Sequence, residues 1–302
     1  MGQLIVDLSD TPAGELLALV LALLSALAHA IFGAINKGGH DPFINRGAIN
    51  LCYGLIAMPF ALFVVPTPSP ELFAFLAAVL IIHVVYETLQ SASFHLGAFT
   101  VVYPIARGTG PFFTALGAIF IFGEHLAPGQ WMGLGILSAA IISLAIANIR
   151  ALRREAVPST TLHIAITVAL ATGLMIAVYT TADAYGIRLA GDPFTFLAWF
   201  FFIDGFAFPL IALWRWRRIS KKPPLDELAL RGLFGAIIGI MSFGALMLAT
   251  RLGKVGEAAA LRETSIIFAT GIGVLIFKEK IDLTRVVIIG FIALGAILIE
   301  LH

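Results

Sequence analysis

Long apolar runs separated by short polar breaks form the pattern of this chain. Each run holds about 20 residues, the length that an α-helix needs to cross the hydrocarbon core of a membrane. The breaks are short, as at 66–71 (PTPSPE) and 221–227 (KKPPLDE), so we expect neighbouring helices to be antiparallel. The pattern predicts ten spanning helices, at roughly 15–36, 46–65, 71–95, 99–122, 129–149, 161–183, 194–215, 228–250, 256–277 and 282–300.

The second half of the chain repeats parts of the first half. The stretch RGTGPFFTALGAIFIFGE at 107–124 returns as RETSIIFATGIGVLIFKE at 262–279, with six residues in register 155 positions later. The tripeptide DPF at 41–43 returns at 192–194. Because each copy holds an odd number of predicted spans, the copies must cross the membrane in opposite orientations, as in many secondary transporters. The two inverted five-helix repeats are expected at 1–155 and 156–302.

The composition agrees with a chain that lies in a lipid bilayer. Of its 302 residues, 60% are hydrophobic and 12% are charged, whereas about a quarter of the residues in a soluble domain are charged. The net charge of +1 gives no field that would attract nucleic acid, so no such partner is expected. We predict an all-α polytopic protein of the bilayer, placed in the inner (plasma) membrane of a bacterium. A monomer and a homodimer are both compatible with the sequence.

Basic residues indicate how the bundle is oriented. Fourteen Lys and Arg residues, Arg46 among them, fall in or beside the loops that follow the odd-numbered predicted helices. The loops on the other side hold only three, which are Arg188, Arg251 and Lys254. Since loops rich in Lys and Arg stay in the cytoplasm, both termini are predicted to lie outside it.

Several motifs carry a resemblance to a known family. They are YPIARG at 103–108, GEHLAPGQW at 123–131, ALRETS at 260–265 and FKE at 277–279. Together with the ten predicted helices, they resemble the EamA-like branch of the drug/metabolite transporter superfamily. The resemblance covers nearly the whole chain. It implies a membrane transporter whose partner is a small-molecule solute.

Two arginines at equivalent places in the repeats are the first candidates for substrate contact. Arg107 lies about one turn after Pro104, a residue that can serve as the first residue of a helix. Arg262 is its counterpart. A guanidinium can hold a carboxylate or a phosphate by two hydrogen bonds, so we hypothesise that the pair binds an anionic group, with one arginine dominating in each access state. The alternative is structural: each arginine ties helix ends together through backbone carbonyls or Glu263.

Further polar side chains inside the predicted spans are candidates for lining the same path. Asp204 falls near the middle of its span, where a carboxylate is costly unless it is paired or protonated. It is therefore a candidate proton carrier, and a static pair with an arginine or a tyrosine is the alternative. Tyr179 and Asp183 are four residues apart and share a helical face. The other candidates for substrate contact are His29, Tyr86, Tyr103, Trp199 and Glu263.

Two more pairs of residues have structural interpretations. His83 and Glu87 are four apart, but two ligands make no complete metal site, so we expect a hydrogen-bonded internal pair and no metal. Glu124 and its counterpart Glu279 close their helices. We expect both to accept hydrogen bonds from the free N–H groups that begin the next helix.

The sequence favours a transporter over other classes of membrane protein. It contains no GxSxG, HExxH, GxGD or P-loop pattern, so we expect neither an enzyme nor a bound cofactor. The leading hypothesis is a secondary-active exporter or exchanger that moves a small polar metabolite by alternating access, and the arginines raise the hypothesis that this metabolite is anionic. A lipid translocator or another non-enzymatic membrane protein is the alternative, and an intramembrane enzyme is less favoured.

Overall fold

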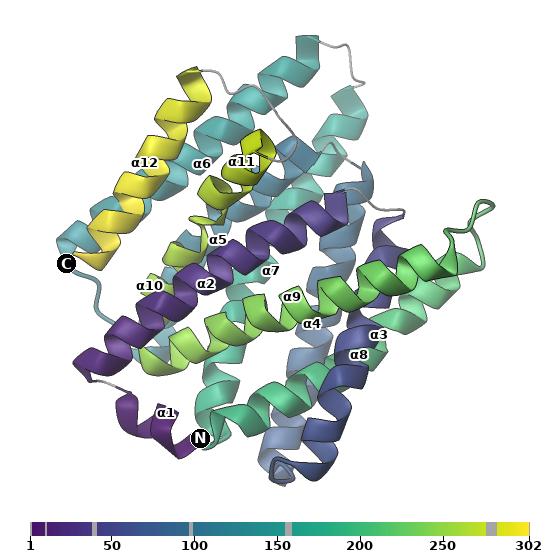
Figure 1. Cartoon of the computed structure of the whole chain (residues 1–302). Coiled ribbons are helices and arrows are strands. Elements are labelled where there is room, and N and C mark those ends of the chain that lie inside the picture. The colour runs from purple at the N-terminus through teal and green to yellow at the C-terminus, as the bar shows by residue number, and fades with distance from the viewer. Residues whose placement is uncertain are drawn as a thin grey trace.

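The chain folds into a bundle of α-helices (Figure 1). The computed structural model describes residues 2–9, 11–37, 41–96, 99–154, 159–275 and 283–301, and every regular element in these ranges is helical. The helices are α1 (Gly2–Leu8), α2 (Pro12–Lys37), α3 (Pro42–Phe63), α4 (Pro70–Leu96), α5 (Phe99–Phe122), α6 (Pro128–Arg154), α7 (Ser159–Leu189), α8 (Pro193–Trp216), α9 (Leu225–Leu252), α10 (Val255–Arg262), α11 (Ser265–Leu275) and α12 (Leu283–Glu300).

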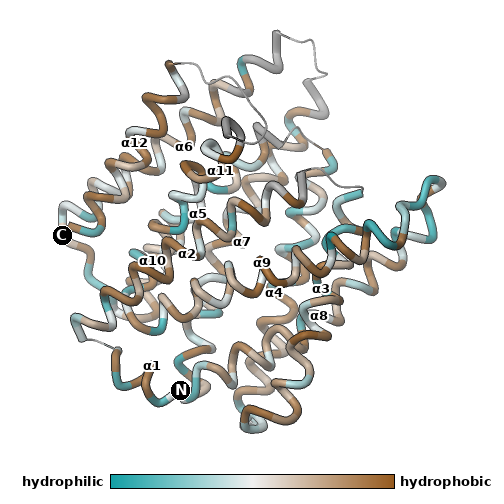
Figure 2. Tube along the Cα trace, viewed as in Figure 1, coloured by the Kyte–Doolittle hydropathy of each residue, from teal (hydrophilic) through white to brown (hydrophobic). Residues whose placement is uncertain are grey.

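The expectation of an all-α polytopic membrane protein is confirmed. Among the described residues, 8 helices, α2 to α9, are long and apolar enough to cross a membrane. Large apolar side chains point outward from them: Phe63 and Phe120 are 84% and 83% exposed. Figure 2 shows hydrophobic residues along the outer helices and a hydrophilic stretch where α8 gives way to α9. Such a surface is suited to lipid rather than to water.

The ninth predicted span differs from the prediction. A single helix over 256–277 was expected, but α10 ends at Arg262 and α11 begins at Ser265. Between them, the N–H groups of Glu263 and Thr264 donate to carbonyls three residues back, over 3.0 Å each, instead of four. The tenth span is α12, whose apolar part is shorter than the other spans. Helix length alone therefore supports eight crossings, and the count of ten rests on α10, α11 and α12.

The DPF tripeptides of the two halves begin equivalent helices. The Asp41 carboxylate accepts a hydrogen bond from the Phe43 N–H over 3.0 Å at the start of α3. The Asp192 carboxylate accepts one from the Thr195 N–H over 2.8 Å at the start of α8. In both helices a proline follows the capping Asp, where its missing N–H costs nothing. The tripeptide repeats because it is a helix start signal.

Helices from the two halves pack closely against each other. α3 lies on α8 and α6 lies on α12, while α2 packs on α9 and α4 on α7. Two of these crossings depend on glycine. A Cβ atom on Gly205 would lie 2.3 Å from the Gly54 Cα, and one on Gly295 would lie 2.7 Å from the Gly133 carbonyl oxygen. The crossing at Gly54 and Gly205 brings the polar side chains next to them, on α3 and α8, into contact.

Two local expectations were wrong, and others fall outside the described residues. Pro104 does not begin a helix, because α5 starts at Phe99 and Pro104 lies inside it. Arg46 is not a loop residue, because it lies in α3 and is buried. The predicted repeat boundary at 155/156 and the predicted joint at Glu279 lie outside the described residues.

Candidate functional site

Two neighbouring groups of buried polar side chains lie inside the bundle, and each member is at most 9% exposed. The arginine cluster consists of His29, Tyr103, Arg107, Tyr179, Ser242, Arg262 and Glu263. The carboxylate cluster consists of Arg46, Asn50, Tyr53, His83, Glu87, Asp183 and Asp204. Both are built from helices of the two halves, so the site lies between the halves.

The arginine cluster brings the two equivalent arginines onto one histidine. The Arg107 guanidinium donates from Nη1 to Glu263 Oε1 over 2.8 Å, and its Nη2 contacts His29 Nε2. The Arg262 guanidinium donates to the Tyr179 hydroxyl over 3.1 Å, and its Nη2 lies 3.0 Å from His29 Nδ1. The Arg107–Glu263 ion pair is the structural contact that the sequence raised as an alternative, whereas the shared histidine was not foreseen.

The imidazole of His29 offers too few acceptors for its neighbours. A neutral imidazole has one ring nitrogen that accepts and one that donates. Arg107 and Arg262 each place an N–H against a different ring nitrogen, so only one of these contacts can be a hydrogen bond to a lone pair. Glu263 Oε2 and Arg262 Nε are also buried without a hydrogen-bond partner among the described residues. The cluster therefore has hydrogen-bonding capacity that its own side chains leave unused.

The arginine cluster carries more positive than negative charge. Its two guanidinium groups face one carboxylate, Glu263, which is ion-paired with Arg107. Arg262 forms no ion pair with a carboxylate in the described part of the chain, and it lies 4.8 Å from the centre of the Phe243 ring. A buried charge of this kind is costly unless another group balances it. The arrangement favours a bound anion.

In the carboxylate cluster, Glu87 is held by two residues of α3. Arg46 donates from Nε over 3.1 Å and from Nη2 to Glu87 Oε1. The Asn50 amide donates to both carboxylate oxygens, over 3.0 Å and 2.9 Å. The expected hydrogen bond between His83 and Glu87 was therefore wrong, because each of these side chains pairs with a different helix.

His83 and Asp204 have partners on other helices. His83 Nε2 lies 3.0 Å and 3.1 Å from the two Asp183 carboxylate oxygens. The Tyr53 hydroxyl donates to Asp204 Oδ2, which is the static pair with a tyrosine that the sequence raised as an alternative. One ligand atom each of His83, Glu87 and Asp204 lie within 4.8 Å of one another, so these three side chains could hold a metal ion.

Aromatic rings separate the two clusters. The Tyr179 ring lies 4.5 Å from the Tyr86 ring and 5.0 Å from the His83 ring, measured between centroids. The guanidinium groups of Arg46 and Arg262 lie 5.9 Å and 4.8 Å from the centre of the Phe243 ring. Tyr86 thus lies between the clusters, and its hydroxyl accepts a hydrogen bond from the side-chain amide of Gln90 over 2.6 Å.

One predicted site residue lies elsewhere. The Trp199 indole donates to the Pro66 carbonyl over 3.2 Å and packs against Phe73, with 5.1 Å between ring centroids. These partners belong to the α3–α4 loop and to α4, and neither is a member of the two clusters. The other nine candidates lie in or between the two clusters.

Sequence reasoning missed three members of the carboxylate cluster. Arg46, Asn50 and Tyr53 lie on α3 at positions i, i+4 and i+7, so they share one helical face. That spacing was visible in the sequence. It was overlooked because Arg46 was assigned to the loop before the helix.

Glu124 is a structural joint, as expected, but its partner differs. Its carboxylate accepts hydrogen bonds from the Val255 N–H over 2.7 Å and the Gly256 N–H over 3.2 Å. These groups begin α10, whereas the expectation was the start of the next helix near Pro128. The joint therefore connects α5 to the short helix that ends at Arg262.

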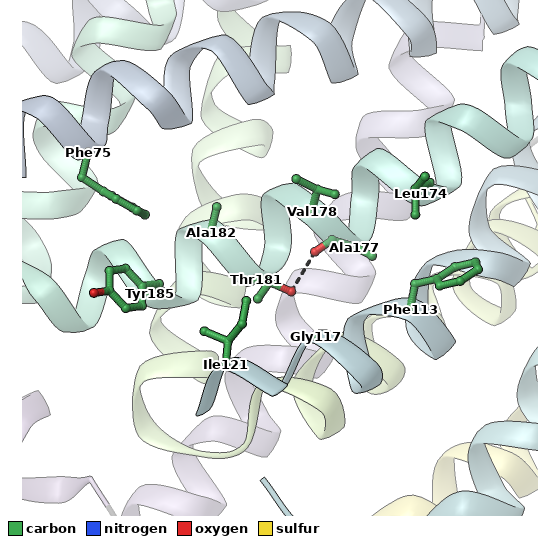
Figure 3. A pocket seen from close by; sticks show the side chains of 10 residues that line it. All are labelled: Phe75, Phe113, Gly117, Ile121, Leu174, Ala177, Val178, Thr181, Ala182 and Tyr185. Atoms are coloured by element: carbon green, nitrogen blue, oxygen red, sulfur yellow. Dashed lines mark hydrogen bonds between the residues drawn. The ribbon is translucent and has the colours of Figure 1, made fainter. Parts of the chain in front are cut away.

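Two apolar cavities lie beside the clusters. One of about 540 Å³ is lined by α4, α5 and α7; Figure 3 shows Thr181 as a polar side chain of its wall, donating to the Ala177 carbonyl over 2.8 Å. The other, of about 710 Å³, lies between α2, α3, α8 and α9. Phe201 lines it and also contacts Tyr53, with 5.4 Å between ring centroids. The linings of these cavities suit apolar ligands, whereas the charged side chains of the two clusters pack against each other.

A bundle of membrane-length helices that buries charged side chains between its two halves is the architecture of a membrane transporter. Residues 163–301 match the EamA-like transporter family, which belongs to the drug/metabolite transporter superfamily. This match confirms the family resemblance predicted from the sequence. The match over residues 163–301, together with the helices of membrane length, supports an integral membrane protein of the drug/metabolite transporter type, for which a small-molecule solute and membrane lipid are the partners.

The fold also occurs in a solved structure. A crystal structure of a protein matches with a TM-score of 0.72 and 17% sequence identity, covering 96% of this chain and 98% of that one. At this identity the match shows the shared fold alone. A search of the curated proteins finds no match.

Proposed function

We propose that this protein is a secondary-active transporter of the bacterial inner membrane. It moves a small anionic metabolite by alternating access, as an exporter or an exchanger. The observation that carries the proposal is the convergence of Arg107 and Arg262 on His29, where the two guanidinium groups are accompanied by one carboxylate, Glu263, which is paired with Arg107.

The chemistry of the arginine cluster favours an anion with several acceptor oxygens. His29 satisfies at most one of the two arginines that face its ring. A carboxylate, phosphate or phosphonate offers lone pairs to both guanidinium groups and balances the excess positive charge. Such a group would bind Arg107 and Arg262 by displacing the imidazole from between them.

The organisation of the chain supports alternating access. Arg107 and Arg262 occupy equivalent places in the proposed inverted repeats, 1–155 and 156–302, yet they meet at one point. Arg262 also ends α10, and the next two N–H groups donate to carbonyls three residues back before α11 begins. Broken helices at the interface of inverted repeats are typical of substrate sites in secondary transporters.

Flux through proteoliposomes tests the proposal. Purified protein is reconstituted, and uptake of radiolabelled small carboxylates, inorganic phosphate and alkylphosphonates is measured. The substitutions R107K and R262K retain the charge but lose the planar fork, so we expect either to reduce flux by more than about tenfold. R217K is the matched control, because Arg217 is exposed on the loop after α8. Flux that survives both arginine substitutions unchanged would refute direct anion binding.

A lipid translocator is the second candidate, and one observation favours it. The cavity of about 710 Å³ has an apolar lining and reaches Phe201, which contacts Tyr53 of the carboxylate cluster. An acyl chain in the cavity would place a polar headgroup beside the buried charges. Liposomes that carry fluorescent phospholipids separate the two candidates: exchange of lipid between leaflets without solute flux would favour translocation of lipid.

A further inference from the structure

We propose that His83, Glu87 and Asp204 form a binding site for a divalent transition-metal ion. His83 and Glu87 are one turn apart on α4, and Asp204 reaches them from α8. One potential ligand atom of each lies within 4.8 Å of the other two, and the residues are 1%, 0% and 2% exposed. This inference is independent of the proposed transport function, because it concerns the carboxylate cluster and not the arginine cluster.

His83 has the outer partner that metal-binding histidines usually have. Its Nε2 faces the Asp183 carboxylate at 3.0 Å, which fixes the ring and leaves Nδ1 available as a ligand. Histidines that bind metals commonly donate their second ring N–H to a carboxylate, which orients the ring and raises its basicity. The pair therefore supplies the carboxylate and the histidine of such an arrangement, and a metal ion bound to Nδ1 would complete it.

Hydrogen bonds also hold the two carboxylate ligands in place, and each carboxylate keeps an oxygen lone pair that could bind a metal ion. Glu87 Oε2 accepts a hydrogen bond from the Asn50 amide over 2.9 Å and retains a second lone pair. Asp204 Oδ2 accepts from Tyr53, while Asp204 Oδ1 is buried and has no hydrogen-bond partner in the described part of the chain. A buried carboxylate oxygen without a partner is costly in an apolar interior. A cation at this point would satisfy it.

The charge of the cluster indicates a divalent ion. Glu87, Asp183 and Asp204 carry three negative charges, and Arg46 supplies one positive charge against them. With a neutral imidazole, which metal ligation requires, a doubly charged cation balances the cluster. Calcium and magnesium prefer sites made only of oxygen, whereas imidazole suits zinc, copper, iron and nickel. Three protein ligands leave a further position open to water.

Cobalt spectroscopy tests the site on the whole protein, purified in detergent without a polyhistidine tag. Titration with Co²⁺ is expected to give a saturable ligand-field absorption at one ion per chain, lost on addition of Zn²⁺. X-ray absorption at the zinc edge is expected to show imidazole nitrogen and carboxylate oxygen ligands. D204N and E87Q should weaken binding at least about tenfold, and D183N, which affects only the outer partner, about 10–100-fold. H163Q is the control, because His163 is exposed on α7.

Two results would overturn the proposal. One is a folded wild-type protein that binds none of Co²⁺, Zn²⁺ and Mn²⁺ saturably, in which case the carboxylates hold only protons. The other is a bound ion without an imidazole ligand, or with an affinity that D204N leaves unchanged. The zinc-edge spectrum needs no substitution, so it decides the question even where a variant fails to fold. Loss of metal binding would leave the flux assay of R107K and R262K unaffected as a test of anion transport.

Discussion

Replacement of the carboxylate of the arginine cluster by an amide should lower the stability of the ligand-free protein and raise its affinity for an anion. In E263Q, the amide keeps the shape of Glu263 and one acceptor oxygen for Arg107, which now donates to it over 2.8 Å. The negative charge is lost, and two buried guanidinium groups remain without a carboxylate between them. The free energy of unfolding should fall by nearly the contribution of a hydrogen bond to a charged group, about 1.5–3 kcal/mol. It should stay below the about 3–5 kcal/mol for deletion of a whole partner from a buried ion pair.

The same change should raise the affinity for the anion. With Glu263 neutral, an incoming carboxylate or phosphonate meets both guanidinium groups and no like charge. We expect binding to become at least about tenfold tighter, which corresponds to about 1.4 kcal/mol. Anions that bind the folded state raise the unfolding temperature in proportion to the logarithm of their concentration. E263Q should therefore start less stable than the wild type and gain more stability on addition of the anion.

Thermal unfolding in detergent, with and without a panel of small anions, measures both effects. E257Q is the matched control, since Glu257 lies on α10, the short helix that Glu263 follows, and its ion pair with Lys254 is partly exposed: the side chains are 23% and 44% exposed. A pair of this kind contributes about 0–1 kcal/mol, so E257Q should change little. The reasoning would be refuted if E263Q were as stable as the wild type, or if no anion stabilised it more than it stabilises the wild type.

Three further substitutions test the fold around the site. In G205A, the new Cβ would lie 2.3 Å from the Gly54 Cα, so we expect a loss of about 1–3 kcal/mol in the free energy of unfolding. The control G135A has open space around the position and should be neutral or stabilising. Equal unfolding temperatures for the two variants would contradict the close crossing. E124A removes the acceptor at the start of α10 and should cost about 0.5–2 kcal/mol, whereas E124Q, which keeps an acceptor, should retain most of the stability. W199F removes a hydrogen bond and should lower the free energy of unfolding by about 1 kcal/mol while anion flux stays unchanged. A loss of flux would indicate that Trp199 belongs to the substrate site.

The long-range features of the fold were predictable because they depend on composition and length. Apolar runs of about 20 residues indicate helices that span a membrane, and the structure has helices at each of the first eight predicted places. The break after Arg262 was not predictable, because no proline or glycine marks it. It depends on the hydrogen bonds of Glu263 and Thr264 to carbonyls three residues back, and these become favourable through tertiary packing.

The site residues also divide into features that could be predicted from the sequence and features that could not. The buried positions of Arg107, Asp204 and Arg262 follow from their place in apolar runs. Their partners do not, because a partner depends on which helices meet. Glu87 was expected to bond one turn along its own helix, yet α3 supplies Arg46 against it.

The glycine crossings restrict which sequences can adopt this fold. At Gly54 and Gly205, and again at Gly133 and Gly295, even an alanine would place an atom within 3 Å of the backbone of the opposing helix. The helix pairs that hold them, α3 with α8 and α6 with α12, lie on opposite sides of the bundle (Figure 1). Natural variants should therefore keep all four positions free of side chains whichever solute they carry, while residues of the polar clusters vary with the cargo. Sequence variation across relatives can in this way separate positions fixed by backbone geometry from positions tuned to chemistry.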